Sequence, residues 1–311
     1  MQVVFSYTAL FREMTMMLTK KKKVIAAVLI GCLGVSTSAI FGKLTTADGV
    51  VSAFYRMFFT SLLLLPVVLI RKREELKAVS RKDLLISILS GIFLGFHFAT
   101  YLTSLQYTSV ASCLILVDMD AVFVALASFF LFRERFSAKS VPAILLAVAG
   151  SIVIALSDRT AGGSNVLFGD LLALAGGLFI AVYTLIGTKQ RSHLSTTVYT
   201  FIVYTAAAVT LFFLCLILKK PFTGYPATDY LCCLGMAVFC TLLGHSMFNY
   251  ALAYVSPAFV STAKLSEPVL SSIAAAFLFG QYPSALQIIG GVLVITGIAW
   301  YILKGIRFER S

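Results

Sequence analysis

Ten apolar runs, each about 20 residues long, follow one another along the chain and leave little room for anything else. An α-helix of that length crosses the roughly 30 Å hydrocarbon core of a bilayer. The longest connection, Arg71 to Asp83, holds about 13 residues, too few for a soluble domain. We therefore expect an all-α membrane protein with ten transmembrane helices. The runs cover residues 24–43, 50–70, 84–105, 109–132, 140–157, 167–187, 197–218, 229–251, 256–279 and 284–303.

Composition agrees with a membrane protein. Hydrophobic residues make up 59% of the chain and charged residues 12%, whereas soluble domains carry about 25% charged residues. The net charge of +12 comes from short flanks between apolar runs, which excludes a basic nucleic-acid surface. The six cysteines lie inside apolar runs without zinc spacing, and we expect packing roles for them. Glycines at 176–177, 290–291 and 297 are most simply helix-packing residues.

The distribution of Lys and Arg predicts the orientation. With ten spans, 19 of the 25 basic residues fall on the side that holds both termini, and four fall on the opposite side. The remaining two, Arg56 and Lys264, lie inside spans. Because basic loops stay in the cytoplasm, both termini are expected to be cytoplasmic in a multi-pass protein of the cytoplasmic membrane. Within the segment 1–23, the residues before Lys20 either form a short amphipathic interfacial segment, or the true start of the protein is Met14, Met16 or Met17.

A shift of 147 residues reveals an internal repeat. Without a gap, residues 109–150 align over 42 positions with residues 256–297, so that Val122 meets Val269 and Gly150 meets Gly297. Span 4 then corresponds to span 9, and the repeat unit is five spans. An odd number forces the copies into opposite orientations, an arrangement typical of secondary transporters with a substrate site near the midplane. We divide the chain into a cytoplasmic segment 1–23, a repeat 24–157, a linker 158–166, a repeat 167–303 and a cytoplasmic tail 304–311.

Five charged residues lie well inside spans: Arg56, Asp118, Asp120, Lys264 and Glu267. Each costs about 2.5–3.5 kcal/mol at the centre of a membrane helix, so they are expected to face one another or a wet cavity. Four of them, all but Asp118, define the predicted substrate site together with nearby polar side chains. It contains Arg56, His97, Tyr101, Asp120, His245, Asn249, Lys264 and Glu267.

The two aspartates of span 4 are predicted to differ in role. Asp120 aligns with Glu267 in the repeat, so we expect Asp120 to line the shared cavity. Asp118 lies about 200° around the helix from Asp120 and points elsewhere. We expect Asp118 to bridge to a neighbouring helix, first through Arg56 and second through His97. Pro268 is assigned a structural role with Asp118.

Two pairs of residues leave alternatives open. Lys264 and Glu267 are spaced i,i+3 and share a helix face, so they form either a structural ion pair or a substrate or proton site. His97 and His245 differ by 148 residues and either carry protons or hydrogen-bond to neighbouring helices. A metal site from these histidines with Asp118 and Asp120 has no diagnostic spacing, and we expect neither a metal nor a cofactor.

Several strings resemble the EamA-type transporters of the drug/metabolite transporter superfamily. The resemblance covers nearly all of residues 24–303 and implies transport of small metabolites such as amino acids or nucleobases. Family members usually have a proline in the middle of spans 4 and 9. Pro268 provides the second, but Ala121 replaces the first, so we expect span 4 to bend less. The acidic residue that ends the fourth helix of each half is Glu134 here, but Gln281 in the second half. The strings are FYRMFFTSLLLLP (54–66), FLGFHFATYLTSLQYTSVAS (93–112), FFLFRERFSAKS (129–140) and LSEPVLSSIAAAFLFGQYPSALQIIGGVLVITG (265–297).

Secondary active transport by alternating access is therefore the leading prediction. Charges of both signs favour a zwitterionic, amino-acid-like substrate, and an unpaired carboxylate suggests proton coupling. The alternative is an intramembrane enzyme that uses buried carboxylates, although the chain lacks the G-x-G-D and G-x-S-G strings of membrane proteases. A channel is third, without a repeated filter string. Expected partners are a small-molecule substrate, membrane lipid and protons, but no nucleic acid, with the chain a monomer or homodimer.

Overall fold

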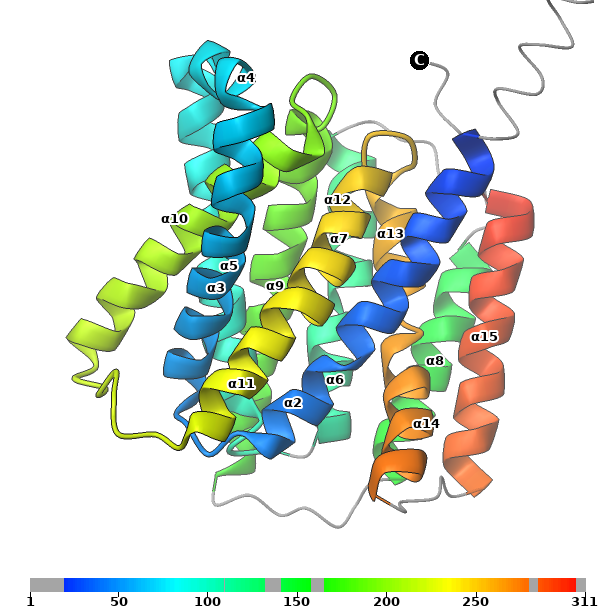
Figure 1. The fold of residues 1–311 in the computed structure, drawn as a ribbon. Coiled ribbons are helices and arrows are strands. Elements are labelled where there is room, and N and C mark those ends of the chain that lie inside the picture. Colours follow the sequence, from blue (N-terminus) through cyan, green and yellow to red (C-terminus); the bar gives the residue numbers. More distant parts are fainter. Residues whose placement is uncertain (1–19, 109, 132–140, 158–164, 280–284, 306–311) are drawn as a thin grey trace, which may run out of the picture.

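The computed structural model describes residues 20–108, 110–131, 141–157, 165–279 and 285–305, and all regular structure within them is helical (Figure 1). Most of the expected N-terminal segment, linker and C-terminal tail lie outside the described residues, as do Glu134 and Gln281. Every apolar run that the sequence predicts as a span contains helix where it is described. The chain is therefore an all-helical protein over the part that the structure describes.

Six stretches are single helical runs that are long and apolar enough to cross a membrane. Their hydropathy and length satisfy the requirement of about 20 residues for a bilayer core. They are Lys20–Gly42, which includes the start of α2 (Ser38–Leu44); α3 (Gly49–Arg71); α5 (Arg81–Ser104); α9 (Val166–Gln190); α10 (Thr196–Ile217); and Ala227–Ala251, composed of α11 (Ala227–Gly235), η1 (Met236–His245) and α12 (Ser246–Ala251).

Two of the other four predicted spans are interrupted, and the other two qualify only as shorter apolar helices, Val141–Gly150 and Ile288–Gly297. Because none of them is a span by the same length and composition, the number of ten transmembrane helices stays a prediction. A short helix, α4 (Arg73–Ala78), lies in the longest connection. The four ranges contain α6 (Val110–Asp118) followed by α7 (Asp120–Leu131), α8 (Val141–Ser157), α13 (Pro257–Lys264) followed by α14 (Glu267–Phe279), and α15 (Ala285–Gly305).

Side-chain caps set the start of most long helices. The hydroxyls of Ser80, Ser195 and Ser256 accept hydrogen bonds from backbone N–H groups in the first turns of α5, α10 and α13. Asp48 and Asn165 do the same for α3 and α9. Each cap satisfies a donor that the first turn of a helix leaves without an intrahelical partner. The helix starts are therefore encoded locally, in the polar residues between apolar runs.

Two helices break at positions that correspond under the 147-residue shift. The first break is at Met119, between α6 and α7, and the second is at Leu265 and Ser266, between α13 and α14. Span 4 is thus interrupted although Ala121 replaces the proline that we took to favour bending. In span 9, Pro268 is the second residue of α14, a position that needs no backbone donor. Proline there suits the start of the second half-helix, but the break forms without it.

Close helix crossings depend on glycine. Along the α8–α15 contact, a Cβ at Gly150 would lie 2.6 Å from the carbonyl oxygen of Gly290. A Cβ at Gly297 would lie 2.7 Å from the carbonyl oxygen of Ala143. The two glycines that the repeat aligns therefore each face the backbone of the other helix, as small residues do in membrane packing. Figure 1 shows α8 and α15 side by side at the edge opposite α10.

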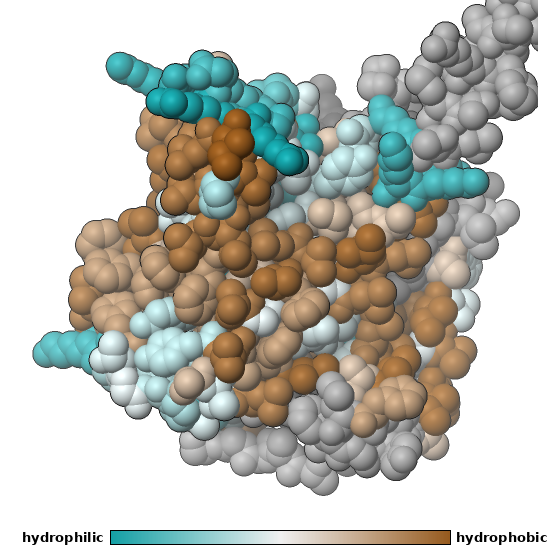
Figure 2. Space-filling model, viewed as in Figure 1, coloured by the Kyte–Doolittle hydropathy of each residue, from teal (hydrophilic) through white to brown (hydrophobic). Residues whose placement is uncertain are grey.

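The outside of the bundle is apolar. Figure 2 shows a brown surface across the middle of the molecule, with hydrophilic residues gathered at the end that carries α4. Ile70 is 81% exposed and Phe277 is 87% exposed, and many other large apolar side chains of the long helices are exposed as well. A surface of this extent is unfavourable in water but matches a hydrocarbon environment. The chain is a multi-pass integral membrane protein.

Candidate functional site

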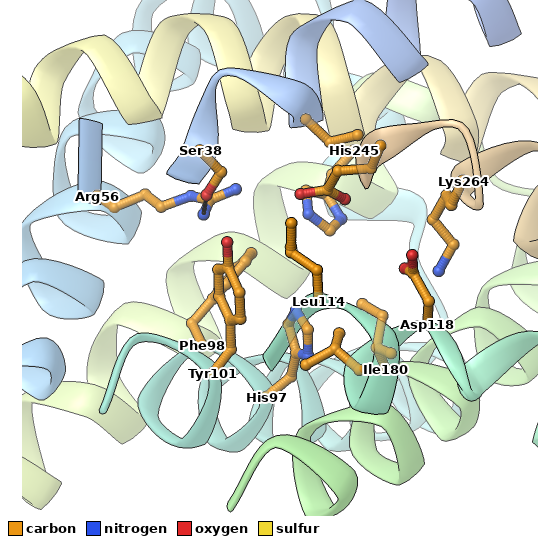
Figure 3. A pocket seen from close by; sticks show the side chains of 13 residues that line it. Ser38, Arg56, His97, Phe98, Tyr101, Leu114, Asp118, Ile180, His245 and Lys264 are labelled. Carbon is orange, nitrogen blue, oxygen red and sulfur yellow. Dashed lines mark hydrogen bonds between the residues drawn. The ribbon is translucent and has the colours of Figure 1, made fainter. Parts of the chain in front are cut away.

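A pocket lies inside the bundle, and charged and aromatic side chains line it (Figure 3). The space between the lining side chains is about 430 Å³, including the part that opens outward. The lining residues come from both halves of the chain. They are Val35, Ser38, Arg56, His97, Phe98, Tyr101, Leu114, Val117, Asp118, Ile180, His245, Lys264 and Glu267.

Arg56 on α3 is held firmly, but not by a carboxylate. Its Nε donates to Thr241 Oγ1 at 2.9 Å and its Nη1 donates to Ser38 Oγ at 3.3 Å. The guanidinium lies over the ring of Phe98, 4.0 Å from the centroid, in a cation–π contact. The structure thus places Arg56 in the pocket but does not join it to Asp118, and the predicted Arg56–Asp118 bridge is wrong. Among the described residues, Arg56 has no carboxylate within ion-pair distance.

The two predicted histidines come together in the pocket. Their ring centroids are 6.3 Å apart, and His97 stacks on Tyr101 at 5.9 Å. His97 Nδ1 is 3.0 Å from the carbonyl oxygen of Gly176, which ties α5 to α9 and supports the structural interpretation of this residue. His245 ends η1, a ten-residue π-helix, and such helices occur frequently at functional sites. The buried Tyr101 Oη has no hydrogen-bond partner among the described residues.

Lys264 forms its ion pair with Asp120, not with Glu267. Its Nζ donates to Asp120 Oδ2, and Ser261 Oγ donates to the same oxygen at 3.0 Å. The predicted i,i+3 pair therefore does not form. The helix breaks at Leu265 and Ser266, between the two residues, so the spacing of a continuous helix no longer applies. Instead, Lys264 connects the end of α13 to the start of α7.

The predicted roles of the two aspartates are exchanged. Asp120 Oδ2 accepts from Lys264 and Ser261, and Asp120 is not among the pocket-lining residues. Asp118 lines the pocket, is 5% exposed, and its Oδ2 has no hydrogen-bond partner in the described part of the chain. The error has a physical reason: the repeat identifies the face of span 4 that meets span 9, and here that face contacts α13 rather than the cavity.

Asn249 lies outside the pocket, in a polar cluster between α9 and α12. Its Nδ2 donates to Tyr183 Oη and, at 2.7 Å, to the carbonyl oxygen of His245. Arg191 Nε donates to the backbone carbonyl of Asn249 at 3.0 Å. Tyr183 links this cluster to the pocket because its ring lies 6.3 Å from that of His245. The structure therefore places Asn249 outside the predicted site and connects it to the pocket through Tyr183.

Ser38, Thr241 and Ser261 were not among the predicted site residues. All three are buried hydroxyls that hold Arg56 or Asp120. Serine and threonine are common in apolar helices, so no sequence signal distinguishes these three from the others. Within the described residues, no group of three or more His, Cys, Asp or Glu side chains is arranged to hold a metal ion.

Comparison with known proteins points in one direction. Residues 22–156 and 167–303 each match the sequence profile described as the EamA-like transporter family. A protein of Archaeoglobus fulgidus named "Uncharacterized transporter" is 28% identical over 79% of this chain and 85% of its own length. A protein of Clostridium kluyveri with the same name is 24% identical over 89% of this chain and 92% of its own.

Two further relatives extend the comparison. A protein of Escherichia coli named "Probable amino-acid metabolite efflux pump" is 26% identical over 75% of this chain and 82% of its own length. A solved crystal structure superposes with a TM-score of 0.72 at 20% identity, covering 89% of this chain and 98% of that one. At that identity the structural likeness bears on the fold alone.

Proposed function

The chain belongs to the EamA-like transporter family and is a membrane transporter, and we propose that it is a secondary active transporter that moves a small metabolite by alternating access. The observation that carries the proposal is the central pocket, where charges of both signs from the two halves of the chain line one space. Binding near the middle of the bundle, between two halves, is what alternating access requires.

Ten spans in two inverted five-helix repeats are part of the proposal. Three features support it: the matched helix breaks at Met119 and at Leu265 and Ser266, the reciprocal glycine contacts of α8 and α15, and the α7–α13 contact between corresponding spans. The α8–α15 contact joins helices that exchange under the 147-residue shift, and the same shift carries the α7–α13 contact onto the contact between α14 and α6. An inverted repeat predicts such self-corresponding pairs on its pseudo-two-fold axis.

The proposed substrate is a zwitterion of amino-acid type. Arg56 provides a fixed positive charge, and Asp118 and Glu267 provide carboxylates in the same pocket. The Escherichia coli relative named as an amino-acid metabolite efflux pump supports this class by similarity only. We further propose coupling to protons, because buried carboxylates that face a cavity can load and release a proton as access alternates.

The protein is proposed to lie in the cytoplasmic membrane with both termini inside, as a monomer or homodimer. The excess of Lys and Arg on one set of loops supports the orientation. Figure 1 agrees with an even number of spans, because the blue first helix begins and α15 ends on the side that carries α4.

Reconstitution in liposomes tests the function. Purified protein is assayed for uptake of radiolabelled amino acids, nucleosides and organic cations, with and without a pH gradient. We expect saturable uptake of a zwitterion that a gradient accelerates. An unchanged rate with the gradient contradicts proton coupling, and conversion of a compound without net flux indicates an enzyme instead.

A further inference from the structure

Asp118 lines the pocket, and its buried Oδ2 has no hydrogen-bond partner among the described residues. Resting on the proposed transport of a zwitterion, we propose that Asp118 binds the cationic group of the substrate, so that the substrate lies across the pocket with its anionic group toward Arg56. The prediction from sequence assigned Asp118 to a helix bridge, and the structure removes that bridge. The residue therefore needs another reason to be charged and buried.

The Asp118 carboxylate is buried without a partner for one of its oxygens. Asp118 is 5% exposed, yet its buried Oδ2 accepts no hydrogen bond from any described residue. A buried carboxylate without a partner is costly, whereas a hydrogen bond from a charged donor restores much of that cost. Asp120, two residues further, already has Lys264 and Ser261 as donors. Asp120 Oδ1 is also without a partner among the described residues, but of the two aspartates only Asp118 lines the pocket, where an incoming ammonium group can reach it.

The end of the pocket around Asp118 is rich in carboxylates. Asp120, Glu267 and Lys264 lie near enough to Asp118 to act on it electrostatically. Lys264 balances Asp120, with which it is paired, and two formal negative charges remain on Asp118 and Glu267. Glu267 is within reach of the positive charge of Arg56 as well as that of Lys264. This end of the pocket therefore holds three carboxylates against one lysine.

The opposite end of the pocket carries the positive charge of Arg56. Figure 3 shows Arg56 and Ser38 on one side of the pocket and Asp118 with Lys264 on the other, with Leu114 between them. Hydroxyls and the ring of Phe98 hold the guanidinium, leaving it available to an anion. Guanidinium groups bind carboxylates well because they present several donors in one plane. The site thus has a cationic end and an anionic end.

The apolar part of the pocket lining suits the uncharged part of the substrate, between its two charged groups. The pocket is lined by four aliphatic side chains, Val35, Leu114, Val117 and Ile180, beside the rings of His97, Phe98, Tyr101 and His245. The aliphatic side chains offer contact to an apolar group but no hydrogen bond. The chemistry that fits all three parts is a zwitterion with an apolar side chain. Leucine is a suitable probe, and its two half-charged analogues are 3-methylbutylamine and 4-methylpentanoate.

The experiment compares Asp118→Asn with Asp170→Asn in purified protein. Asp170 is the matched control: it lies on α9, accepts from Thr108 Oγ1 at 2.7 Å, and does not line the pocket. Binding of radiolabelled leucine is measured, with each analogue as competitor. We expect Asp118→Asn to weaken leucine and 3-methylbutylamine by about tenfold or more while 4-methylpentanoate competes as before, because one charge-assisted hydrogen bond is lost. Asp170→Asn should bind like the wild type.

The other possible results separate the role of Asp118 from the proposed transport function. If wild-type protein binds leucine and Asp118→Asn binds it equally well, Asp118 is not the cation site, although the proposed function stands. Equal weakening of both analogues also overturns the inference, since it indicates a general disturbance. If the wild type transports only substrates without a cationic group, the zwitterion proposal and this inference both fall.

A measurement on the wild type applies if Asp118→Asn does not fold. Carbodiimide modification of carboxyl groups is mapped by peptide mass spectrometry with and without ligand. We expect modification of Asp118, with protection by leucine and 3-methylbutylamine but not by 4-methylpentanoate. Absence of modification, or modification that leucine leaves unchanged, would overturn the proposal.

Discussion

Lys264, the last residue of α13, forms an ion pair with Asp120, the first residue of α7, inside the apolar bundle. The two residues come from opposite halves of the chain and lie at the two helix breaks. Their pairing joins the halves at the point where each has an end of a half-helix. We infer that the pair fixes the crossing of spans 4 and 9, and that the substrate pocket is built beside it.

Breaking this pair on one side should destabilise the protein strongly. Asp120→Asn leaves the charge of Lys264 buried, and Lys264→Met does the same to Asp120. We expect each to lower the free energy of unfolding by about 3–5 kcal/mol, and the double variant to recover part of the loss. The measurement is thermal unfolding in detergent, monitored by size-exclusion chromatography.

The exposed Lys77–Glu74 pair is the control for that series. Its side chains are 58% and 84% exposed, so Lys77→Met should change stability little. If Asp120→Asn and Lys264→Met are as stable as Lys77→Met, the pair does not hold the halves together.

Glycine contacts between α8 and α15 give a second prediction. Gly150→Ala and Gly297→Ala should each reduce thermal stability, because the added methyl would lie under 3 Å from backbone atoms of the other helix. Gly291→Ala is the matched variant on α15. Its nearest neighbour would be Val269 at 3.6 Å, an ordinary contact, and we expect a stability close to wild type. Equal stability of all three variants would show that the helices separate easily.

Glu75 predicts a dependence of stability on pH. Burial raises the pKa of Glu75, but hydrogen bonds from Lys72 and from the backbone N–H of Ser195 outweigh it, and the pKa lies below its ordinary value of 4.5. Because folding favours the charged form, its contribution is present above that ordinary value and is lost as the pH falls through the folded-state pKa.

The variant Glu75→Gln tests this contribution. It should melt slightly below wild type at neutral pH, by a small margin because the Glu75 side chain is 31% exposed. The difference should narrow as the pH is lowered below 4.5. A difference that stays constant over the whole range would indicate loss of packing rather than of charge.

Helix positions were predictable because they depend on local patterns. Apolar runs place the helix ends within a few residues: the run predicted over 197–218 is α10, Thr196–Ile217. The repeat also relates Gly150 to Gly297, and each of them faces the backbone of the other helix of the α8–α15 pair. These features depend on residues close in sequence or on direct correspondence between the halves.

Ion-pair partners were not predictable in the same way. Lys264 has Glu267 three residues away in sequence, yet it pairs with Asp120, 144 residues distant. The choice depends on a helix break that residues of other helices help to set, and a single sequence gives no distance between helices. For the same reason Asp118 and Asp120 were given each other's environments. The presence of charges in the centre was predictable, but their connections were not.

Transport by wild-type protein, Glu267→Gln and Arg56→Ala in the same liposomes tests the central claim most directly. Both residues line the pocket, and both variants should insert and purify like the wild type but lose uptake of the zwitterion. Lys77→Met, on the surface, should transport normally. Full transport by both Glu267→Gln and Arg56→Ala would contradict the account and would show that the substrate site lies elsewhere in the molecule.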